Sequence, residues 1–169
     1  MDFKINNTKD LERMLKYIEK QAQDSLRRAS LEVEKMMKEY VISKLYDSYS
    51  PNEYLRSYNY LNSLTVKRVY KNNNGELETE IYFDPNKIYS RELHDSYWNQ
   101  HMSLNGDTTW GGKSISEWIP IWMEHGVSNS KWDRDGIKVI DNILKQLDGD
   151  KKFKKMMMSE LRKKGFKVE

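Results

Sequence analysis

Apolar residues recur at steps of three and four along the first third of the chain. The series runs from Leu11 to Leu45, and neither proline nor glycine interrupts it before Pro51. This spacing gathers the apolar side chains on one face of a helix. The pattern predicts a single helix over residues 8–46.

A helix of this length needs more cover than a small domain supplies. At about 1.5 Å per residue it exceeds about 50 Å, which is too long for a domain of this size to cover throughout. We therefore expect part of its apolar face to meet a neighbouring copy, another partner or an extension of its own chain, and the geometry favours a homo-oligomer. The alternative is a helix that breaks near Arg28 and folds back as a helical hairpin.

The pattern then changes to the alternation that is typical of strands. Residues 64–70 are rich in β-branched side chains, Asn74-Gly75 marks a tight turn, and residues 76–83 alternate again. These features predict a β-hairpin over residues 64–83. Two strands alone are marginally stable, so we expect further strand pairing within the chain or across a subunit boundary.

The next stretch of the chain is less regular. Residues 91–102 fit a short helix, and residues 115–123 are apolar and aromatic. Pro120 lies in the middle of the second segment and argues against both a continuous helix and a central strand there.

Helical spacing returns near the C-terminus. It appears from Ile137 to Leu147 and again from Phe153 to Leu161, and residues 166–168 fit a short terminal strand. The chain is therefore predicted to be α+β, with C-terminal helices packed on a small antiparallel sheet. We expect one domain over residues 1–169, with the long helix at 8–46, a sheet region at 64–126 and C-terminal helices at 136–165.

Composition narrows the class of protein. Of the 169 residues 37% are hydrophobic and 33% charged, but five Trp and eleven Tyr argue against disorder. The absence of cysteine excludes disulfides and thiolate metal sites. No apolar run approaches the roughly 20 residues that span a bilayer, and the first seven residues lack a signal-peptide core. We expect a cytoplasmic protein with no membrane partner.

The charge is unevenly distributed. A formal net charge of +3 does not by itself imply nucleic-acid binding. Residues 145–169, however, hold nine Lys or Arg against four acidic residues. Such a segment either faces DNA or is the solvated face of a helix. The candidates for facing DNA are Lys151, Lys152, Lys154 and Lys155.

No motif in the chain indicates catalysis. The histidines are His94, His101 and His125, and they form no metal-ligand spacing such as H-E-x-x-H. Phosphate-loop and nucleophile-elbow motifs are also missing. We expect no enzyme, no metal and no cofactor. The enzymatic alternative is a hydrolase or nuclease that uses one of the histidines within residues 91–126.

Five tryptophans fall within 35 residues, which is many for one small core. Aromatic side chains are enriched at the centres of protein interfaces, and aromatics on loops also stack on single-stranded bases. Few basic residues lie near these tryptophans, which favours the protein interface; burial in the core remains open. The candidate interface residues are Trp110, Trp118, Trp122, Glu124 and Gly126.

A corner links the long helix to the first strand. Residues 49–64 read Y-x-P-x-x-Y-x-R-S-x-x-Y-L-x-S-L. Pro51 ends the helix near Tyr49 because proline disfavours a helical residue before it. Spacing alone indicates a corner with Tyr54, Leu61 and Leu64 on one buried side. Its residues of interest are Tyr49, Pro51, Tyr54, Arg56, Ser57, Leu61 and Ser63.

This segment resembles the signature of a family of small structural proteins of long-tailed bacteriophages, described as tail components or head–tail joining proteins. That family has a long helix, the Y-x-P-x-x-Y-x-R-T-x-x-L-x-x-S segment, a β-hairpin, an aromatic segment ending in Glu-x-Gly, and a C-terminal helix. The Glu-x-Gly counterpart here is Trp-Met-Glu-His-Gly at residues 122–126. Ser57 replaces the usual Thr, and Tyr60 stands where that segment has Leu.

The resemblance implies a non-enzymatic protein that forms a ring at the head–tail junction or tail end, where it completes the tail or joins it to the head. Its implied partners are further copies, neighbouring neck or tail proteins, and DNA passing through the channel. It would occur in the host bacterial cytoplasm during assembly and then in the virion. The alternatives are a small nucleic-acid-binding protein that uses the basic tail and loop tryptophans, and a bacterial toxin or accessory protein.

Overall fold

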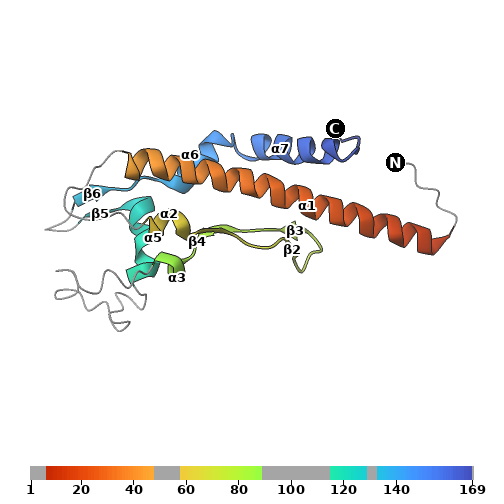
Figure 1. Ribbon diagram of the computed structural model, residues 1–169, viewed down its shortest axis with the longest axis horizontal. Coiled ribbons are helices and arrows are strands. Elements are labelled where there is room, and N and C mark those ends of the chain that lie inside the picture. Colours follow the sequence, from red (N-terminus) through yellow and green to blue (C-terminus); the bar gives the residue numbers. More distant parts are fainter. Residues whose placement is uncertain (1–6, 48–57, 89–114, 129–132, 169) are drawn as a thin grey trace. The chain divides into compact units, whose positions relative to one another are not determined.

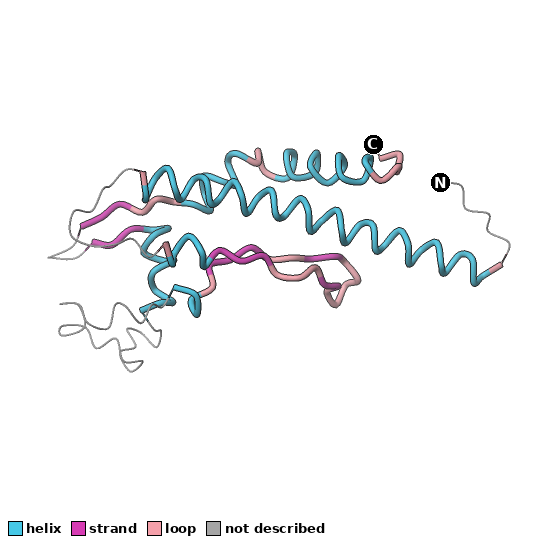
Figure 2. The backbone as a smooth tube through the Cα atoms, in the orientation of Figure 1, coloured by secondary structure: helices cyan, strands magenta, loops and turns pink. Residues whose placement is uncertain are grey.

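The computed structural model describes residues 7–47, 58–88, 115–128 and 133–168. The chain divides into two compact units. The first unit combines Met1–Glu34, Val66–Ile81 and Leu144–Glu169, and the second combines Lys35–Thr65 and Tyr82–Ile143. The architecture is α+β, as the sequence predicts (Figures 1 and 2).

The long helix α1 spans Thr8–Val41. Its start is fixed by Asn7, whose side-chain oxygen accepts a hydrogen bond from the Asp10 amide at 3.0 Å. A π-helical turn, η1, continues it over Ile42–Tyr46. The predicted end near residue 46 is therefore confirmed. The alternative of a break near Arg28 is wrong, because no proline or glycine interrupts the backbone hydrogen bonding there.

Helix α7, Asp150–Lys163, lies antiparallel to α1 within the first unit (Figure 1). Arg28 pairs with Glu160 at 3.6 Å, and Lys164 pairs with Asp24 at 3.6 Å. The Lys164 ammonium also donates to the carbonyl oxygen of Gln21 at 3.1 Å. Residues further along α7 thus contact residues nearer the start of α1, so the two helices run in opposite directions.

The expected terminal strand at residues 166–168 is wrong. Gly165 has φ +85°, and its amide donates to the Arg162 carbonyl at 2.9 Å. The Phe166 amide donates to the Leu161 carbonyl at 3.1 Å. These two bonds form the Schellman motif that ends a helix at a left-handed glycine. The Phe166 ring then stacks on Tyr17 of α1, with centroids 6.3 Å apart.

The predicted β-hairpin is confirmed. Its strands are β1 (Leu64–Val66), β2 (Tyr70–Lys71), β3 (Leu77–Glu78) and β4 (Ile81–Phe83), with β1 paired to β4 and β2 antiparallel to β3. Asn72 closes the turn by accepting the amides of Asn74 and Glu76, both at 2.9 Å. Within the described residues each of these strands has one partner, so the expected further pairing is not found there.

The sheet region expected at residues 64–126 also contains helices. These are α3 (Pro85–Ile88) and α5 (Ile115–His125), while α2 (Asn59–Ser63) precedes the hairpin. The expectation that Pro120 prevents a continuous helix is wrong, since Pro120 lies inside α5. Proline removes one hydrogen bond at a cost of about 3 kcal/mol. Half-burial of residues 119–123 offsets this cost.

A second hairpin follows α5 and was not predicted. Strand β5, Gly126–Ser128, is antiparallel to β6, Asp133–Asp135. Helix α6, Val139–Gln146, comes next and confirms the first C-terminal helix. The buried apolar residues of the described chain are Ala29, Val33, Met37, Val41, Tyr60, Leu64, Ile88, Val139, Ile143 and Leu147.

Candidate functional site

The Glu-x-Gly motif forms a tight backbone corner in the second unit. Helix α5 ends at His125, and Gly126 opens β5 with φ +84°. Gly136 follows β6 and lies against this corner. A Cβ atom on Gly136 would clash with the carbonyl oxygen of Glu124 and would lie only 2.6 Å from the amide nitrogen of Gly126. Only glycine fits at residue 136 without moving the corner.

The Glu124 side chain links this corner to helix α6. It is 8% exposed, and its two carboxylate oxygens accept the amides of Ile140 at 3.0 Å and Asp141 at 3.2 Å. These amides belong to the first turn of α6, whose N–H groups lack partners within the helix. A negative charge at this end of a helix is also stabilised by the helix dipole. Glu124 therefore acts as an N-terminal cap supplied from 16 residues earlier.

Two further bonds close the same corner. The Ile137 amide donates to the Met123 carbonyl at 2.7 Å. The Tyr40 hydroxyl of α1 donates to the Ile137 carbonyl at 3.0 Å. The end of α5, the start of α6 and the end of α1 are thereby joined in one hydrogen-bonded arrangement inside the second unit.

This geometry gives Glu124 a structural use. Both oxygens of its carboxylate are engaged by backbone amides, and its neighbour His125 is exposed. These bonds give the carboxylate a role in holding the first turn of α6. Its predicted role in an interface stays a prediction.

An aromatic cluster forms the described part of the helix-to-strand corner. The rings of Tyr60 and Phe83 stack with centroids 4.4 Å apart, and those of Tyr46 and Tyr58 stack at 4.6 Å. The Tyr60 hydroxyl is buried and has no hydrogen-bond partner within the described residues. Burial, together with the negative charge of Glu124 and nearby Tyr46, raises the pKa of Tyr60 far above its ordinary value.

Ser63 fixes the step from this corner into the hairpin. It is fully buried, and its hydroxyl donates to the Tyr60 carbonyl at 2.7 Å. Its own carbonyl accepts the Asp84 amide at 2.8 Å. Leu61 is half-buried and Leu64 is buried. The other predicted corner residues (Tyr49, Pro51, Tyr54, Arg56 and Ser57) lie outside the described residues.

The predicted tryptophan interface is described only in part. Trp122 is half-buried on α5, and Trp118 lies on the same helix. Trp110 lies outside the described residues. The described part of the chain therefore joins Glu124 and Gly126 in one corner, and it leaves the grouping of the tryptophans as a prediction.

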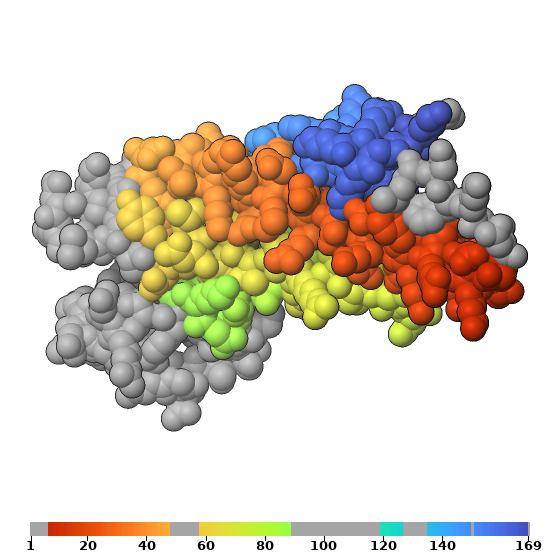
Figure 3. All heavy atoms as spheres, turned by 45° about the vertical axis from the view of Figure 1, so that its right-hand side comes forward, coloured from red at the N-terminus to blue at the C-terminus, as the bar shows by residue number. Residues whose placement is uncertain are grey.

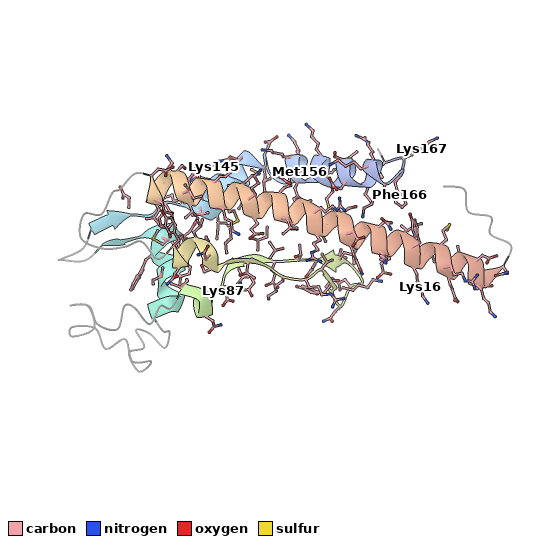
Figure 4. The ribbon with its side chains drawn as sticks, in the orientation of Figure 1. Lys16, Lys87, Lys145, Met156, Phe166 and Lys167 are labelled. Atoms are coloured by element: carbon pink, nitrogen blue, oxygen red, sulfur yellow. The ribbon has the colours of Figure 1, made fainter. Side chains whose placement is uncertain are left out.

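The four lysines proposed to face DNA differ in their surroundings. Lys151 pairs with Asp148 at 3.7 Å, and Lys154 is exposed. Lys152 and Lys155 line a groove of about 340 Å³ between α7 and α1, with Met156 and Ala29 among its other lining residues. Figure 4 shows Met156 on the side of α7 that faces α1. Within the described chain, Lys152, Lys154 and Lys155 form no ion pair.

Glu160, on the same helix as these lysines, also lines the groove. It pairs with Lys163 at 2.5 Å and with Arg28 at 3.6 Å. The hydrogen bond from Lys163 and the charges of Lys163, Arg28 and Lys164 lower the pKa of Glu160, against the raising effect of burial. Its carboxylate therefore stays ionised and ties α7 to α1.

Other kinds of site find no support in the described part of the chain. No group of three or more His, Cys, Asp or Glu residues there is placed to hold a metal ion. None of its helices combines the length and the apolar character needed to cross a membrane. His94 and His101 lie outside the described residues.

Sequence reasoning missed two residues of the second unit. Tyr60 was passed over, although it stands at the position that is leucine in the family's segment. Gly136 was interpreted only as a helix start. The available signal was the pair Gly126 and Gly136: Gly126 is the first residue of β5, and Gly136 directly follows its partner strand β6.

Comparison with known proteins identifies one relationship. A family model described as YomN matches residues 7–163, which is nearly the whole chain. The family name derives from a Bacillus phage or prophage and indicates a phage-associated protein. Neither a curated protein nor a solved structure matches the chain.

Proposed function

The chain belongs to the YomN family, and we propose that it is a structural protein of a phage or prophage particle. In this proposal copies assemble as a ring at the head–tail junction or at the tail end, where they complete the tail or join it to the head. The protein is made in the host bacterial cytoplasm and is retained in the virion. It acts by assembly and carries out no catalysis.

The observation that carries the proposal is the match to a phage-associated family over residues 7–163. The order of elements adds support, since a long helix, a hairpin, an aromatic helix ending in Glu-His-Gly and C-terminal helices follow one another as the resemblance implies. In the buried corner, the Glu-x-Gly motif fixes the end of α5 against the start of α6, which supports a structural role for that motif in the protomer.

The test is the composition of purified particles from the source strain, measured by quantitative mass spectrometry. We expect the chain at a fixed low ratio to the major capsid protein. Deletion of its gene should leave separate heads and unfinished tails, and the wild-type chain supplied in trans should restore joined particles. Absence from intact particles, combined with abundance in the cell, would contradict a role in the virion.

We also propose that the unpaired lysines of α7 face DNA within the ring. Lys152, Lys154 and Lys155 support this, because they form no ion pair among the described residues and so retain their charge for phosphate contacts. Reversing all three to Glu should reduce DNA retention in particles. The matched control reverses Lys9, Lys20 and Arg27, three exposed basic residues of α1. Unchanged DNA retention and infectivity in the triple variant would remove this part of the proposal.

A nucleic-acid-binding protein without a virion role predicts a different result. The free protein would then bind DNA with an affinity that falls steeply as salt rises. Measurement of binding at two salt concentrations, alongside the particle analysis, separates the two functions.

A further inference from the structure

One apolar stripe runs along α1 and changes character along its length. Leu11, Leu15, Ile18, Ala22, Ser25 and Ala29 follow one another at alternating steps of four and three, so they share one face of the helix. Ser25 and Ala29 are 0% and 1% exposed. Leu11, Leu15 and Ile18 are 39%, 54% and 39% exposed. The largest apolar side chains thus lie where the chain covers them least.

The change follows the cover that the first unit provides. Phe166 at the end of α7 reaches Tyr17, and Lys71 of the hairpin reaches Glu19 at 2.9 Å. The first turns of α1 continue past both elements (Figure 1). In the space-filling view these turns form part of the molecular surface (Figure 3). An amphipathic face of this kind is stabilised when a partner removes it from water.

The charges beside the stripe identify the class of partner. Residues 8–24 carry four basic and four acidic side chains, so this segment has no net charge. A membrane surface or a nucleic acid would favour an excess of cations on such a helix. Balanced charges at regular helical spacing fit another helix of the same composition.

We infer that the exposed stripe Leu11–Leu15–Ile18 binds the same stripe of a second copy, with the two α1 helices antiparallel. In this arrangement Leu11 of each copy faces Leu15 of the other. Glu12 and Lys16, four residues apart on one flank of the stripe, then lie beside Lys16 and Glu12 of the other copy. Neither residue forms an ion pair within the described chain, and Figure 4 shows Lys16 projecting outward from α1.

The charges also select the antiparallel arrangement over the parallel one. In a parallel, in-register pair the flank with Glu12 and Glu19 meets the opposite flank of the other helix, which carries Asn7, Met14 and Gln21. That arrangement forms no ion pair along the stripe. The antiparallel arrangement forms two equivalent Glu12–Lys16 pairs, because a twofold axis repeats each contact.

The first experiment measures self-association of the full chain by sedimentation equilibrium at concentrations from about 1 to 200 μM. We expect a weak dimer. Leu15→Glu should raise the dimer dissociation constant at least about 30-fold, because it places two charges in the apolar contact. The matched control is Leu144→Glu on α6, at a leucine that is 55% exposed and lies outside the stripe; it should leave the constant unchanged. A wild-type monomer throughout this range would overturn the inference.

Cysteine cross-linking tests the orientation, since the chain has no native cysteine. Facing Leu11 with Leu15 puts the twofold axis near residue 13. The two copies of residue 14 are then offset by only about 3 Å along the helices, so Met14→Cys should form an intersubunit disulfide readily. Ile18→Cys should not, because the two copies of residue 18 would be offset by on the order of 15 Å along the helices. The reverse pattern would indicate parallel helices and overturn the antiparallel arrangement.

Charge exchange tests the ion pairs. Lys16→Glu should weaken the dimer by about threefold or more, and the double variant Glu12→Lys/Lys16→Glu should restore it. Failure of the double variant to restore association would remove the Glu12–Lys16 contact. A chain lacking residues 1–6 tests whether the N-terminus covers the stripe instead. If only the shortened chain associates, the second copy is not the natural occupant.

This inference stands apart from the proposed place in a particle. A dimer in solution is measured on purified protein, whereas the role in the virion is measured on particles. If the dimer is not found, the proposed role in the virion still stands, and if the chain is absent from particles, the inferred dimer still stands.

Discussion

The apolar stripe of α1 is covered by the rest of the chain along one half of the helix and exposed along the other. From Ala22 to Val33 the stripe carries small or medium side chains that the chain buries wholly or in part, and α7 is tied alongside by Arg28, Asp24 and Gln21. Over the first turns it carries Leu and Ile in the open. Small residues allow close approach of a neighbouring element, whereas large ones supply apolar area to a partner. The covered half therefore stabilises the fold, and the open half is the surface that we propose for association.

The largest expected effect separates the two halves directly. Ala29→Glu places a carboxylate at a fully covered position and should lower the free energy of unfolding by about 3 kcal/mol or more. Leu15→Glu, on the same stripe, should change it by no more than about 0.5 kcal/mol at a concentration where the protein is monomeric. Urea unfolding followed by circular dichroism measures both. Equal losses of unfolding free energy in the two variants would show that the first turns of α1 are covered as well, and would contradict the distinction between the two halves.

The caps of α1 and α6 extend the comparison to the helix ends. Asn7 caps α1 at an exposed position, whereas Glu124 caps α6 from a buried one. Glu124→Ala leaves two amides without partners and removes a favourable charge, so we expect a loss of about 2 kcal/mol. Asn7→Ala should cost about 0.5 to 1 kcal/mol. The same urea experiment ranks them, and an equal or larger loss for Asn7→Ala would contradict the buried-cap assignment.

A smaller effect is expected where α7 is held against α1. Lys164 is largely buried, pairs with Asp24 and donates to Gln21, whereas Lys151 makes an exposed pair with Asp148. Lys164→Met should lower stability by about 1 kcal/mol and speed amide exchange in the last turns of α7. Lys151→Met should leave both unchanged. Identical behaviour of the two variants would mean that Lys164 does not anchor α7.

The sequence predicted the elements that local spacing determines. The unbroken series from Leu11 to Leu45 predicted α1, and Asn74-Gly75 predicted the first hairpin, because each signal lies within the element that it describes. The same periodicity predicted that α1 would have more apolar face than one small chain covers. Leu11, Leu15 and Ile18 confirm that excess, although periodicity could not say which end would be open.

The candidate corner escaped prediction because its contacts are not local. Glu124 caps a helix that begins 15 residues later, and Gly136 is required only because Glu124 and Gly126 pass close by. Pro120 was given too much weight, since the packing of α5 outweighs the loss of one hydrogen bond. Phe166 looked like a strand residue, but the left-handed Gly165 turns it back onto Tyr17.

The smallest expected effect is a pH dependence of stability that comes from Glu160, the residue of α7 that pairs with Arg28 on the covered half of α1. The pKa of Glu160 is lowered in the folded chain, chiefly by its hydrogen bond with Lys163. A lowered folded-state pKa contributes stability that is present above the ordinary carboxyl value near 4.5 and is lost as the pH falls through the folded value. Glu160→Gln should therefore lower the unfolding temperature slightly at about pH 7. The difference from wild type should shrink as the pH falls below 4.5 and vanish once the pH lies below the lowered pKa of Glu160. A difference at Glu160 that persists in acid would mean that its contribution comes from packing against α1 and not from its charge.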